Sequence, residues 1–363
     1  MKRMLVMLLA ALLLAACGTN GPTGQSGAPA DAAPTAGADA AATSAPATAA
    51  PDAAAPGSQQ NAEVISNLKL GLDWTPNTNH TGLYVARDKG YYRDVALNVE
   101  IVQAQEGGTV EQLVAAGRLD FGISYQEGVT QARVEGLPIV SVAAVIQHNT
   151  SGFASRASAG ITSPKDFEGK KYGAYGSPVE RAVIQGLMEC AGADVNKVQF
   201  VDIGSTDFFV ATERGDVDFA WIFQGWTGME AEQRNVPLNV VMMNDLNCVP
   251  DYYTPVLITS EKLIAERPDL VRRFVEATAR GYQFAISNPA ESADLLLAAA
   301  PELDAGLVRR SQRYLSAQYQ AGAPRWGEQK LEIWRGYAQW MADRKLISSM
   351  IEPDKAFTNQ FLP

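Results

Sequence analysis

Residues able to do acid–base, nucleophilic or metal chemistry are sparse in this chain. His80 and His148 are the only histidines, and they lie too far apart in sequence to form a metal-binding pair on one helix. The sequence has no phosphate-binding glycine loop, no Gly-x-Ser-x-Gly motif and no Cys-x-x-Cys pair. Carboxylates alone can catalyse, but no nucleophile with an adjacent base stands out. We therefore expect no catalytic residue, no metal and no cofactor, and a hydrogen-bonded role for each histidine.

Aromatic side chains, by contrast, gather where strands are expected to end. Trp74 ends the first expected strand, and Tyr125 directly follows a later one. Each could be a core residue, but their clustering at strand ends favours a cleft lined with flat apolar faces and a few orienting polar groups. The aromatic candidates are Trp74, Tyr125, Trp221, Phe223, Trp226, Tyr252 and Tyr253, and the polar ones are Asn77, Asn79, Gln126, Glu127, Gln224 and Asp251.

Two glycine-containing turns precede expected helices and add backbone donors. They are Glu106-Gly107-Gly108-Thr109 and Gly176-Ser177-Pro178-Val179-Glu180. Thr109 and Ser177 are suited to be N-caps, and Ser177 is followed by a proline and by a glutamate three residues on. Helix N-termini can bind anions, but capping alone also explains both turns. Arg181 is the only nearby cation, so Gly176 and Ser177 suit a neutral polar ligand as well as a phosphorylated one.

The elements that must position these residues alternate between strand-like and helical patterns. Such a rhythm predicts an α/β fold with largely parallel sheets, and the chain becomes mainly helical after Glu261. Strands are expected at 68–72, 97–102, 121–124, 139–145, 172–174, 199–201, 219–223 and 238–243. Helices are expected at 109–116, 179–190 and 208–213, and then as long helices at 262–300, 305–320 and 328–344.

One segment of the first half is repeated in the second half. Residues 113–122 and 209–220 both resemble a helix end, a glycine turn, an aspartate and a buried strand. The two copies lie about 98 residues apart, which is too far for a solenoid repeat and suits two similar α/β lobes. Ligands bind at the carboxyl ends of strands in open α/β sheets, so two facing lobes predict a cleft between them.

The N-terminus has the pattern of a secretory signal peptide. Residues 1–16 contain a short basic head and an apolar run too short to span a bilayer. The small residues before Cys17 resemble the bacterial lipobox, so we expect Cys17 to be acylated and to anchor the mature protein in a membrane. Residues 17–62 are rich in Ala, Pro, Gly, Ser and Thr, which predicts a disordered tether.

Charge and cysteine content narrow the partners. The net charge is −10 and the pI is about 4.9, which disfavours nucleic acid as a partner. With Cys17 assigned to lipid, Cys190 and Cys248 remain. They could form a disulfide in an oxidising compartment, but Cys190 follows an apolar helical run and fits a core position. The pairing is left open.

Residues 72–92 resemble the signature of a known family. The segment LDWTPNTNHTGLYVARDKGYY is similar to that of thiamine-pyrimidine-binding proteins of ABC importers and of the fungal pyrimidine synthases. The resemblance extends from about Leu68 past Pro268 and includes the motifs around Asp120 and Asp251. It implies a two-lobed periplasmic-binding-protein fold with the ligand cleft between the lobes. Some members bind aminopyrimidine thiamine precursors, and others in the wider group serve riboflavin uptake.

Two departures from the synthases argue against that chemistry. The synthase histidine that is consumed as substrate would fall near Gly128, and the cysteine-rich synthase segment holds only Cys248 here. The resemblance therefore implies a solute-binding lipoprotein that delivers a heteroaromatic vitamin to an ABC permease and its ATPase, on the outer face of the cell membrane. We expect Trp74 to stack on the ligand ring, with Asn77, Asn79 and His80 at its edge.

The expected organisation and ligand complete this prediction. Lobe one should comprise residues 63–148 and the returning C-terminal region 254–363, and lobe two residues 149–253. Riboflavin is favoured over formylaminopyrimidine or hydroxymethylpyrimidine, because several aromatic residues suit a three-ring plane. Both ligands stay open. The predicted ligand-binding residues are Trp74, Asn77, Asn79, His80, Tyr125, Gln126, Glu127, Gly176, Ser177, Trp221, Gln224, Trp226, Asp251 and Tyr252.

Overall fold

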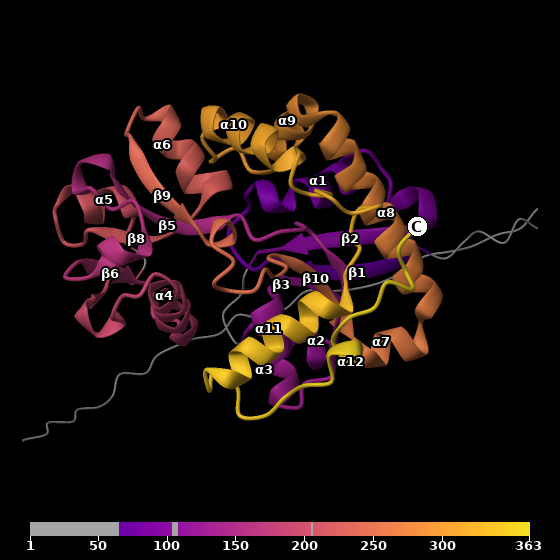
Figure 1. Cartoon of the computed structure of the whole chain (residues 1–363). Coiled ribbons are helices and arrows are strands. Elements are labelled where there is room, and N and C mark those ends of the chain that lie inside the picture. The colour runs from indigo at the N-terminus through magenta and orange to yellow at the C-terminus, as the bar shows by residue number, and fades with distance from the viewer. Residues whose placement is uncertain (1–64, 104–107, 205) are drawn as a thin grey trace, which may run out of the picture. The chain divides into compact units, whose positions relative to one another are not determined.

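The computed structural model describes residues 65–103, 108–204 and 206–363. The expected signal peptide, the acylated Cys17, the tether and the turn residues Glu106 and Gly107 lie outside this part of the chain. The described residues form two five-stranded sheets covered by helices (Figure 1). Each sheet with its helices is called a lobe below: lobe one contains β1 to β4 and β10, and lobe two contains β5 to β9. The expected α/β, two-sheet fold is confirmed.

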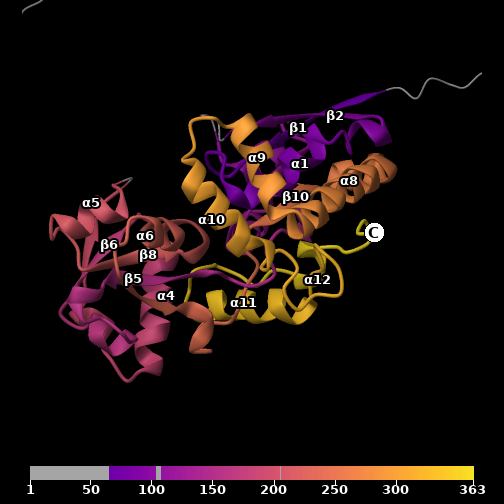
Figure 2. The same cartoon turned by 90° about the horizontal axis from the view of Figure 1, so that it is seen from above.

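Lobe one is built on a sheet of strand order β2-β1-β3-β10-β4. Strand β3, inside the sheet, and strand β4, at its edge, are both buried along their whole length, and the free edge of β4 is covered by bridges from Ser141 to Phe357 and from Ala144 to Gly327. Helix α8 lies beside α1 in Figure 1 and Figure 2, and the two pack against each other. The strands are β1 (Ser66–Gly71), β2 (Leu97–Val102), β3 (Phe121–Ser124), β4 (Ile139–Ala144) and β10 (Val256–Ser260), and the helices are α1 (Thr81–Asp88), α2 (Val110–Ala115), α3 (Gln126–Val134), α7 (Glu261–Glu266), α8 (Pro268–Ser287), α9 (Pro289–Ala299) and α12 (Pro353–Ala356).

Lobe two repeats this plan with strand order β7-β6-β8-β5-β9. Its core is rich in aromatic residues, with Phe167 and Phe219 stacked at 4.3 Å between ring centroids. The strands are β5 (Ser151–Arg156), β6 (Lys171–Ala174), β7 (Gln199–Asp202), β8 (Phe219–Phe223) and β9 (Leu238–Met242), and the helices are α4 (Pro178–Cys190), α5 (Phe208–Glu213), α6 (Met229–Gln233) and the π-helix η6 (Gln224–Gly228).

The repeat seen in the sequence is confirmed as a structural repeat. Gly117 and Gly215 both adopt left-handed conformations, with φ of 67° and 72°, and end their helices. The aspartate directly before the buried strand of each copy accepts a hydrogen bond from the backbone of the parallel neighbouring strand. Asp120 accepts from the Lys69 amide at 2.8 Å, and Asp218 accepts from the Lys171 amide at 2.8 Å. Each aspartate thus fixes the register of its strand.

Two strands were missed, and the sheets are mixed rather than largely parallel. Strand β10 runs antiparallel to β3 and β4, and β5 runs antiparallel to β8 and β9. Strand β5 has the sequence SGFASR, whose Ser, Gly and Ala residues carry little strand propensity, so only its burial between two strands explains it. The chain crosses between the lobes twice, from β4 to β5 and from β9 to β10. The expected lobe boundaries after His148 and Tyr253 fall in these crossings and stay predictions.

The C-terminal region is more broken than expected. The helix expected at 262–300 is three helices, because Pro268 and Pro289 each start a new helix at a first-turn position. The last long helices are α10 (Ala305–Ser316) and α11 (Leu331–Asp343). Their packing also differs from a simple return to lobe one, because both helices contact both lobes.

Helix α11 illustrates this double contact. Trp334 belongs to an apolar cluster of lobe one, whereas Tyr337 belongs to the lobe-two cluster and stacks on Tyr252 at 4.1 Å. At the end of the helix, Arg344 pairs with Glu189 at 3.1 Å. The two lobes are therefore joined by packed helices as well as by the two chain crossings.

Cys190 and Cys248 form a disulfide, which closes a segment of 58 residues within lobe two. The interpretation of Cys190 as a core residue was wrong, because the last turn of α4 turns this position toward solvent. Within the described ranges, no helix is both long and apolar enough to cross a membrane.

Candidate functional site

Two adjoining cavities lie between the lobes. The outer cavity has a volume of about 900 Å³, and the inner cavity has a volume of about 300 Å³. Both take residues from lobe one, from lobe two and from the crossings between them. The residues that line both cavities are Trp74, Tyr125, Phe223, Thr227 and Thr254.

Exposed aromatic residues concentrate in the outer cavity. Trp74, Tyr175 and Phe223 expose 64%, 43% and 42% of their surface, although side chains of this size are normally buried. All three line the outer cavity, together with Tyr125 and Trp221. An apolar patch held open to solvent in a cleft is the usual signature of a binding site for a flat ligand.

The loop that carries Trp74 is held by a local hydrogen-bond network. Trp74 lies three residues beyond the end of β1, not in the strand itself. Asn77 accepts from the Asn79 amide at 2.9 Å and donates to the Thr75 carbonyl at 3.0 Å, so its side chain is used in capping the turn η1 (Thr78–His80). The amide side chain of Asn79 takes no part in this network and faces the inner cavity.

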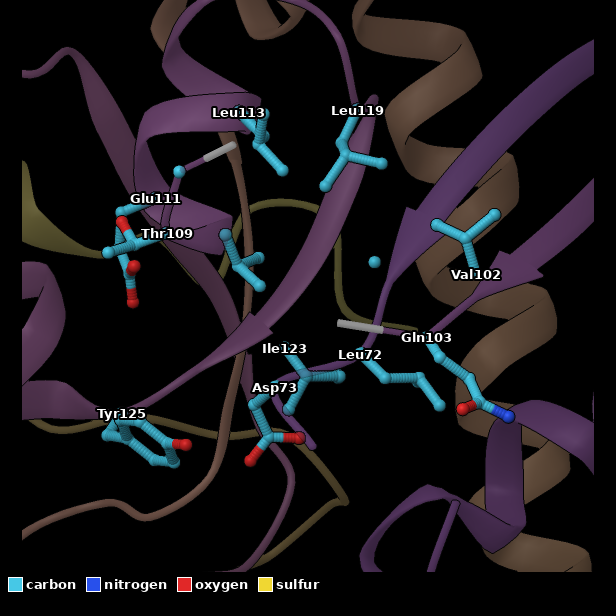
Figure 3. A pocket seen from close by; sticks show the side chains of 13 residues that line it. Leu72, Asp73, Val102, Gln103, Thr109, Glu111, Leu113, Leu119, Ile123 and Tyr125 are labelled. Carbon is cyan, nitrogen blue, oxygen red and sulfur yellow. The ribbon is translucent and has the colours of Figure 1, made fainter. Parts of the chain in front are cut away.

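His80 is fully buried and lines neither cavity. Its Nδ1 accepts from the Asn77 amide, so Nε2 carries the proton and donates to Asp73 at 2.7 Å. Asp73 in turn lies opposite Tyr125, as Figure 3 shows in a third cavity of about 280 Å³ at the end of the lobe-one sheet. Burial raises the pKa of Tyr125, and the carboxylate of Asp73 raises it further. His80 therefore positions the wall of the cleft.

Two acidic side chains of lobe one face the outer cavity. Glu111, in α2, accepts a hydrogen bond from the Ser124 hydroxyl, and Glu127 lies in the first turn of α3. Burial raises the pKa of Glu127 to about 7, with Glu111 adding a smaller repulsion. The Oε2 atom of Glu127 is buried without a protein partner. Glu127 is thus close to half-ionised at neutral pH.

Gln126 has a structural role instead. It is fully buried, its Oε1 accepts from the Tyr253 amide at 2.9 Å and its Nε2 donates to the Ile333 carbonyl at 3.3 Å. The side chain ties α3 to the second crossing and to α11. It lines neither cavity, although it was predicted as a ligand-binding residue.

The carboxylate of Asp251 is likewise hydrogen-bonded within the protein, to residues of the crossings. Its carboxylate accepts from His148 Nδ1 at 2.5 Å and from the Asn149 amide at 2.9 Å, and so links the two crossings to each other. The neighbouring Tyr252 does line the outer cavity, where burial raises its pKa.

The turn at Gly176 is explained by capping. Ser177 and Glu180 form a capping box at the start of α4, and Gly176 has a positive φ of 99°. The carboxylate of Glu180 accepts from the Ser177 amide, the Tyr175 amide and the Tyr172 hydroxyl. Because Glu180 already occupies the Tyr175 and Ser177 amides, capping accounts for these donors without a bound anion.

The π-helix η6 follows β8 and carries lobe-two groups into the cleft. Trp226 and Thr227 line the inner cavity, whereas Gln224 lines neither, and its Oε1 is buried without a partner. Trp221 lines the outer cavity with its indole Nε1 buried and unpartnered. A π-turn of this kind frequently marks a functional site.

The structure thus brings most of the predicted residues to one cleft. Those lining a cavity are Trp74, Asn77, Asn79, Tyr125, Glu127, Ser177, Trp221, Trp226 and Tyr252; those lining neither are His80, Gln126, Gly176, Gln224 and Asp251. Their part in ligand binding stays a prediction. Sequence reasoning missed Tyr175, Glu111, Thr150 and Thr254. Tyr175 follows strand β6, so the strand-end rule used for Tyr125 could have found it.

The charge of the cleft is one-sided. Among the described residues that line the two cavities there is no lysine or arginine. The acidic residues that line them are Asp73, Glu111, Glu127, Glu135 and Glu180. A phosphorylated or sulfonated ligand would meet no countercharge here, whereas a neutral ligand needs none and a weakly basic one would meet carboxylates.

Within the described residues, no group of three or more His, Cys, Asp or Glu side chains could hold a metal ion. Gly128 lies where the resemblance places the histidine of the synthases. A β-carbon at this position would lie 2.9 Å from Glu111 Oε1 and 3.1 Å from Ser124 Oγ. A larger side chain would fit only if these two groups moved.

Known proteins resemble this chain along most of its length. The chain is 28% identical to the formylaminopyrimidine-binding protein of Halalkalibacterium halodurans, over 82% of this chain and 91% of that protein. It is 26% identical to the riboflavin-binding protein RibY of Chloroflexus aurantiacus, over 83% and 87%. It is also 25% identical to the 4-amino-5-hydroxymethyl-2-methylpyrimidine phosphate synthase of Legionella pneumophila, over 82% and 93%.

Solved structures share the fold. The alkanesulfonate-binding protein SsuA of Xanthomonas axonopodis pv. citri superposes with a TM-score of 0.62 at 14% identity, covering 82% of this chain and 99% of that one. The periplasmic aliphatic sulphonate binding protein SsuA of Escherichia coli gives a TM-score of 0.64 at 15% identity, covering 80% and 91%. At these identities the likeness extends to the fold, here the periplasmic-binding-protein type. By the match of its residues 77–292, the chain belongs to the NMT1/THI5-like family.

Proposed function

We propose that this protein is the extracytoplasmic solute-binding component of an ABC importer for an uncharged heteroaromatic vitamin, with riboflavin as the ligand. The observation that carries the proposal is the cleft itself, in which exposed Trp74, Tyr175 and Phe223 line one cavity that no lysine or arginine of the described residues lines. Flat apolar faces from both lobes suit a planar ring held between them. The lack of countercharge suits a ligand without phosphate or sulfonate.

Size favours the larger of the two candidate rings. The outer cavity of about 900 Å³ exceeds what a single pyrimidine ring fills, and aromatic side chains line it from both lobes. A three-ring plane can contact several of them at once, and each stacking contact contributes about 0.5–1.5 kcal/mol beyond burial. The relative named as riboflavin-binding covers 83% of this chain.

The membrane arrangement follows from the N-terminus. Acylation at Cys17 would hold the protein on the outer face of the cell membrane, and residues 18–62 would give the lobes reach from it. A permease and its ATPase would be the partners. Replacing Cys17 with Ser should release the protein from membranes and leave the affinity of the purified protein for its ligand unchanged. Persistent membrane attachment of that variant would contradict the lipid anchor.

A thiamine-precursor aminopyrimidine is the second candidate, and the acidic pair of lobe one favours it. Glu111 and Glu127 offer carboxyl groups to an exocyclic amino group and a ring nitrogen. The relative named as formylaminopyrimidine-binding covers 82% of this chain. The two candidates use the same cleft and differ in ring size and in the chemistry of the ring edge.

An enzymatic role receives less support. A relative named as a phosphate synthase is 25% identical, but this chain has glycine at position 128 and a well-packed surrounding there. A binding protein needs only the cleft, which the fold supplies.

Fluorescence titration tests the proposal. Riboflavin emission should be quenched on saturable binding to the purified protein, because an aromatic stacking partner quenches the flavin, and flavin mononucleotide should bind far more weakly because its phosphate meets acidic side chains. Calorimetry with hydroxymethyl- and formylaminopyrimidine runs in parallel. Saturable binding of an aminopyrimidine with no response to riboflavin would reverse the choice of ligand and leave the solute-binding role intact.

A further inference from the structure

The inner cavity differs in chemistry from the outer one. Its walls are the turn η1, the π-helix, the two crossings and Leu315 of α10. Asp73 is the only charged residue among the described residues that line it, and its carboxylate already accepts a hydrogen bond from His80. The remaining polar groups are neutral amides and hydroxyls: Thr75, Asn77, Thr78, Asn79, Thr150, Thr227 and Thr254.

Two of these hydroxyls belong to buried threonines and open onto the cavity without a partner among the described residues. Thr150 and Thr254 expose 5% and 4% of their surface and lie on the first and second crossing respectively. Neither Oγ1 makes a hydrogen bond within the described residues, and neither is sealed off from the cavity. A threonine hydroxyl that opens onto a cavity and has no protein partner can both donate to and accept from a polar group bound there.

Other polar side chains of the inner cavity are already hydrogen-bonded within the protein. Thr78 Oγ1 lies 2.5 Å from Ser311 Oγ, which itself donates to the Gly225 carbonyl. The side chain of Asn77 is fully used in capping η1. By contrast, Asn79 and Thr227 make no side-chain hydrogen bond within the described residues, so four neutral groups from both lobes and both crossings converge on this cavity: Asn79, Thr150, Thr227 and Thr254.

The inner cavity adjoins the part of the outer cavity where the ligand ring is proposed to stack. Trp74 and Phe223 line both cavities, so a ring stacked on them in the outer cavity has the inner cavity beside it. A volume of about 300 Å³ is sufficient for a hydroxylated substituent of the ring. The floor is apolar, with Ile146, Pro255 and Leu315, which suits a carbon chain whose hydroxyl groups point outward to the four polar groups.

We propose that the inner cavity is a subsite for an uncharged, hydroxylated substituent carried by the ring of the ligand. This inference rests on the proposed function and specifies its ligand class: a heteroaromatic ring with a polyhydroxylated or hydroxymethyl side chain. The hydroxyls of Thr150 and Thr254 bond the hydroxyls of that substituent, and the nearby carboxylate of Asp73 disfavours its phosphorylated form.

Riboflavin and lumiflavin are the probes, since they share the three-ring system and lumiflavin carries a methyl group in place of the hydroxylated chain. The native protein should bind riboflavin at least about tenfold more tightly than lumiflavin. Thr150→Val and Thr254→Val keep the shape of the side chain and remove its hydroxyl. Thr150→Val, whose side chain lines the inner cavity alone, should weaken riboflavin binding about three- to tenfold and leave lumiflavin binding unchanged. Thr254→Val, whose side chain lines both cavities, should weaken riboflavin binding more than lumiflavin binding. Thr162→Val, on an exposed turn of lobe two, is the matched control and should change neither affinity.

Equal binding of the two flavins, or an equal loss of both in the threonine variants, overturns the subsite. Failure of the riboflavin proposal has a different signature, in which neither flavin binds and an aminopyrimidine does. The same comparison then uses hydroxymethylaminopyrimidine and its methyl analogue. A preference for the hydroxymethyl compound that Thr150→Val and Thr254→Val abolish supports the subsite, and equal affinities overturn it.

Discussion

The ends of the two repeated strands differ in what they leave free. After β3 the chain continues as Tyr125-Gln126, and after β8 it continues as Phe223-Gln224. Both glutamine amides donate to a crossing between the lobes, Gln126 to the Tyr253 carbonyl at 3.1 Å and Gln224 to the Thr150 carbonyl at 2.9 Å. In both copies, therefore, the residue two positions or one position after the strand is held by a backbone hydrogen bond to a crossing: the second crossing for lobe one and the first crossing for lobe two.

Beyond these amides the copies diverge. Lobe one continues into the regular helix α3, and the Gln126 side chain is fully bonded. Lobe two continues into the π-helix, Phe223 is 42% exposed, and Gln224 Oε1 has no partner among the described residues. One scaffold thus gives a fully bonded wall in lobe one and, in lobe two, a wall whose exposed Phe223 lines both cavities while the Gln224 side chain lies outside them. A binding protein needs such exposed apolar groups where its ligand docks.

Removing the disulfide should produce the largest difference between the lobes. The Cys190–Cys248 bond closes 58 residues of lobe two, and no disulfide is present in the described part of lobe one. The double variant Cys190→Ala/Cys248→Ala should lower the free energy of unfolding of lobe two by about 2–4 kcal/mol. Calorimetry should resolve a lobe-two transition that moves down while the lobe-one transition stays. An equal shift of both transitions would contradict lobe-specific stabilisation.

The two glutamines provide the next contrast. Gln126→Leu leaves the buried Tyr253 amide without an acceptor, so the free energy of unfolding should fall by about 2–3 kcal/mol in urea denaturation. Gln224→Leu removes an oxygen that is already without a partner, so it should change the free energy of unfolding by less than about 0.5 kcal/mol. Similar losses in both variants would mean that the lobe-two glutamine is bonded after all.

The pH dependence of stability should reflect Glu127. Its pKa is raised by burial from 4.5 to about 7. Between these values the unfolded chain has released a proton that the folded chain still holds. The free energy of unfolding should therefore fall by about 2 kcal/mol as pH rises from about 4.5 to about 7. The full pKa shift would give a larger fall, and partial exposure of the side chain reduces it, although Oε2 itself is buried.

Substitution separates Glu127 from its neighbours. The ionisable groups that face it are Glu111, Tyr125, Tyr252 and Tyr337. Glu127→Gln should reduce the change in the free energy of unfolding between pH 4.5 and pH 7, as measured by urea denaturation at each pH. Glu135→Gln, an exposed acid on the same cavity, is the control and should keep the native slope. An unchanged slope in Glu127→Gln would assign the effect elsewhere.

How much was predictable depended on whether local sequence or tertiary packing decided the outcome. The strands with β-branched or aromatic residues, such as β2 and β8, were predicted at their observed bounds, and so was the capping box at Ser177. Strand β5 was missed, because its Ser, Gly and Ala residues become a strand only between two others. The aromatic residues of the cleft were found from their position after strands.

Polar site residues were harder to predict, because side chains compete for the same bonds. Gln126 and Asp251 look like ligand groups in sequence, yet backbone amides from distant segments use them. Thr150 and Thr254 look unremarkable in sequence, and only the meeting of both crossings at one cavity places them on its wall. Hydrogen-bond partners far apart in the chain have no local signal.

The smallest expected effect, and the most direct test of the two walls, concerns the stacking residues. Trp74 belongs to lobe one and Phe223 to lobe two, and both line both cavities. If a flat ring lies between them, Trp74→Ala and Phe223→Ala should each weaken riboflavin binding by about tenfold, or about 1.4 kcal/mol, in fluorescence titration. Tyr91→Ala, which removes a ring outside both cavities, should leave the affinity unchanged.

A loss confined to Trp74→Ala would show that the ring stacks on lobe one alone. In that case lobe two closes over the ligand without stacking on it, and the contrast between the two walls would extend to ligand binding.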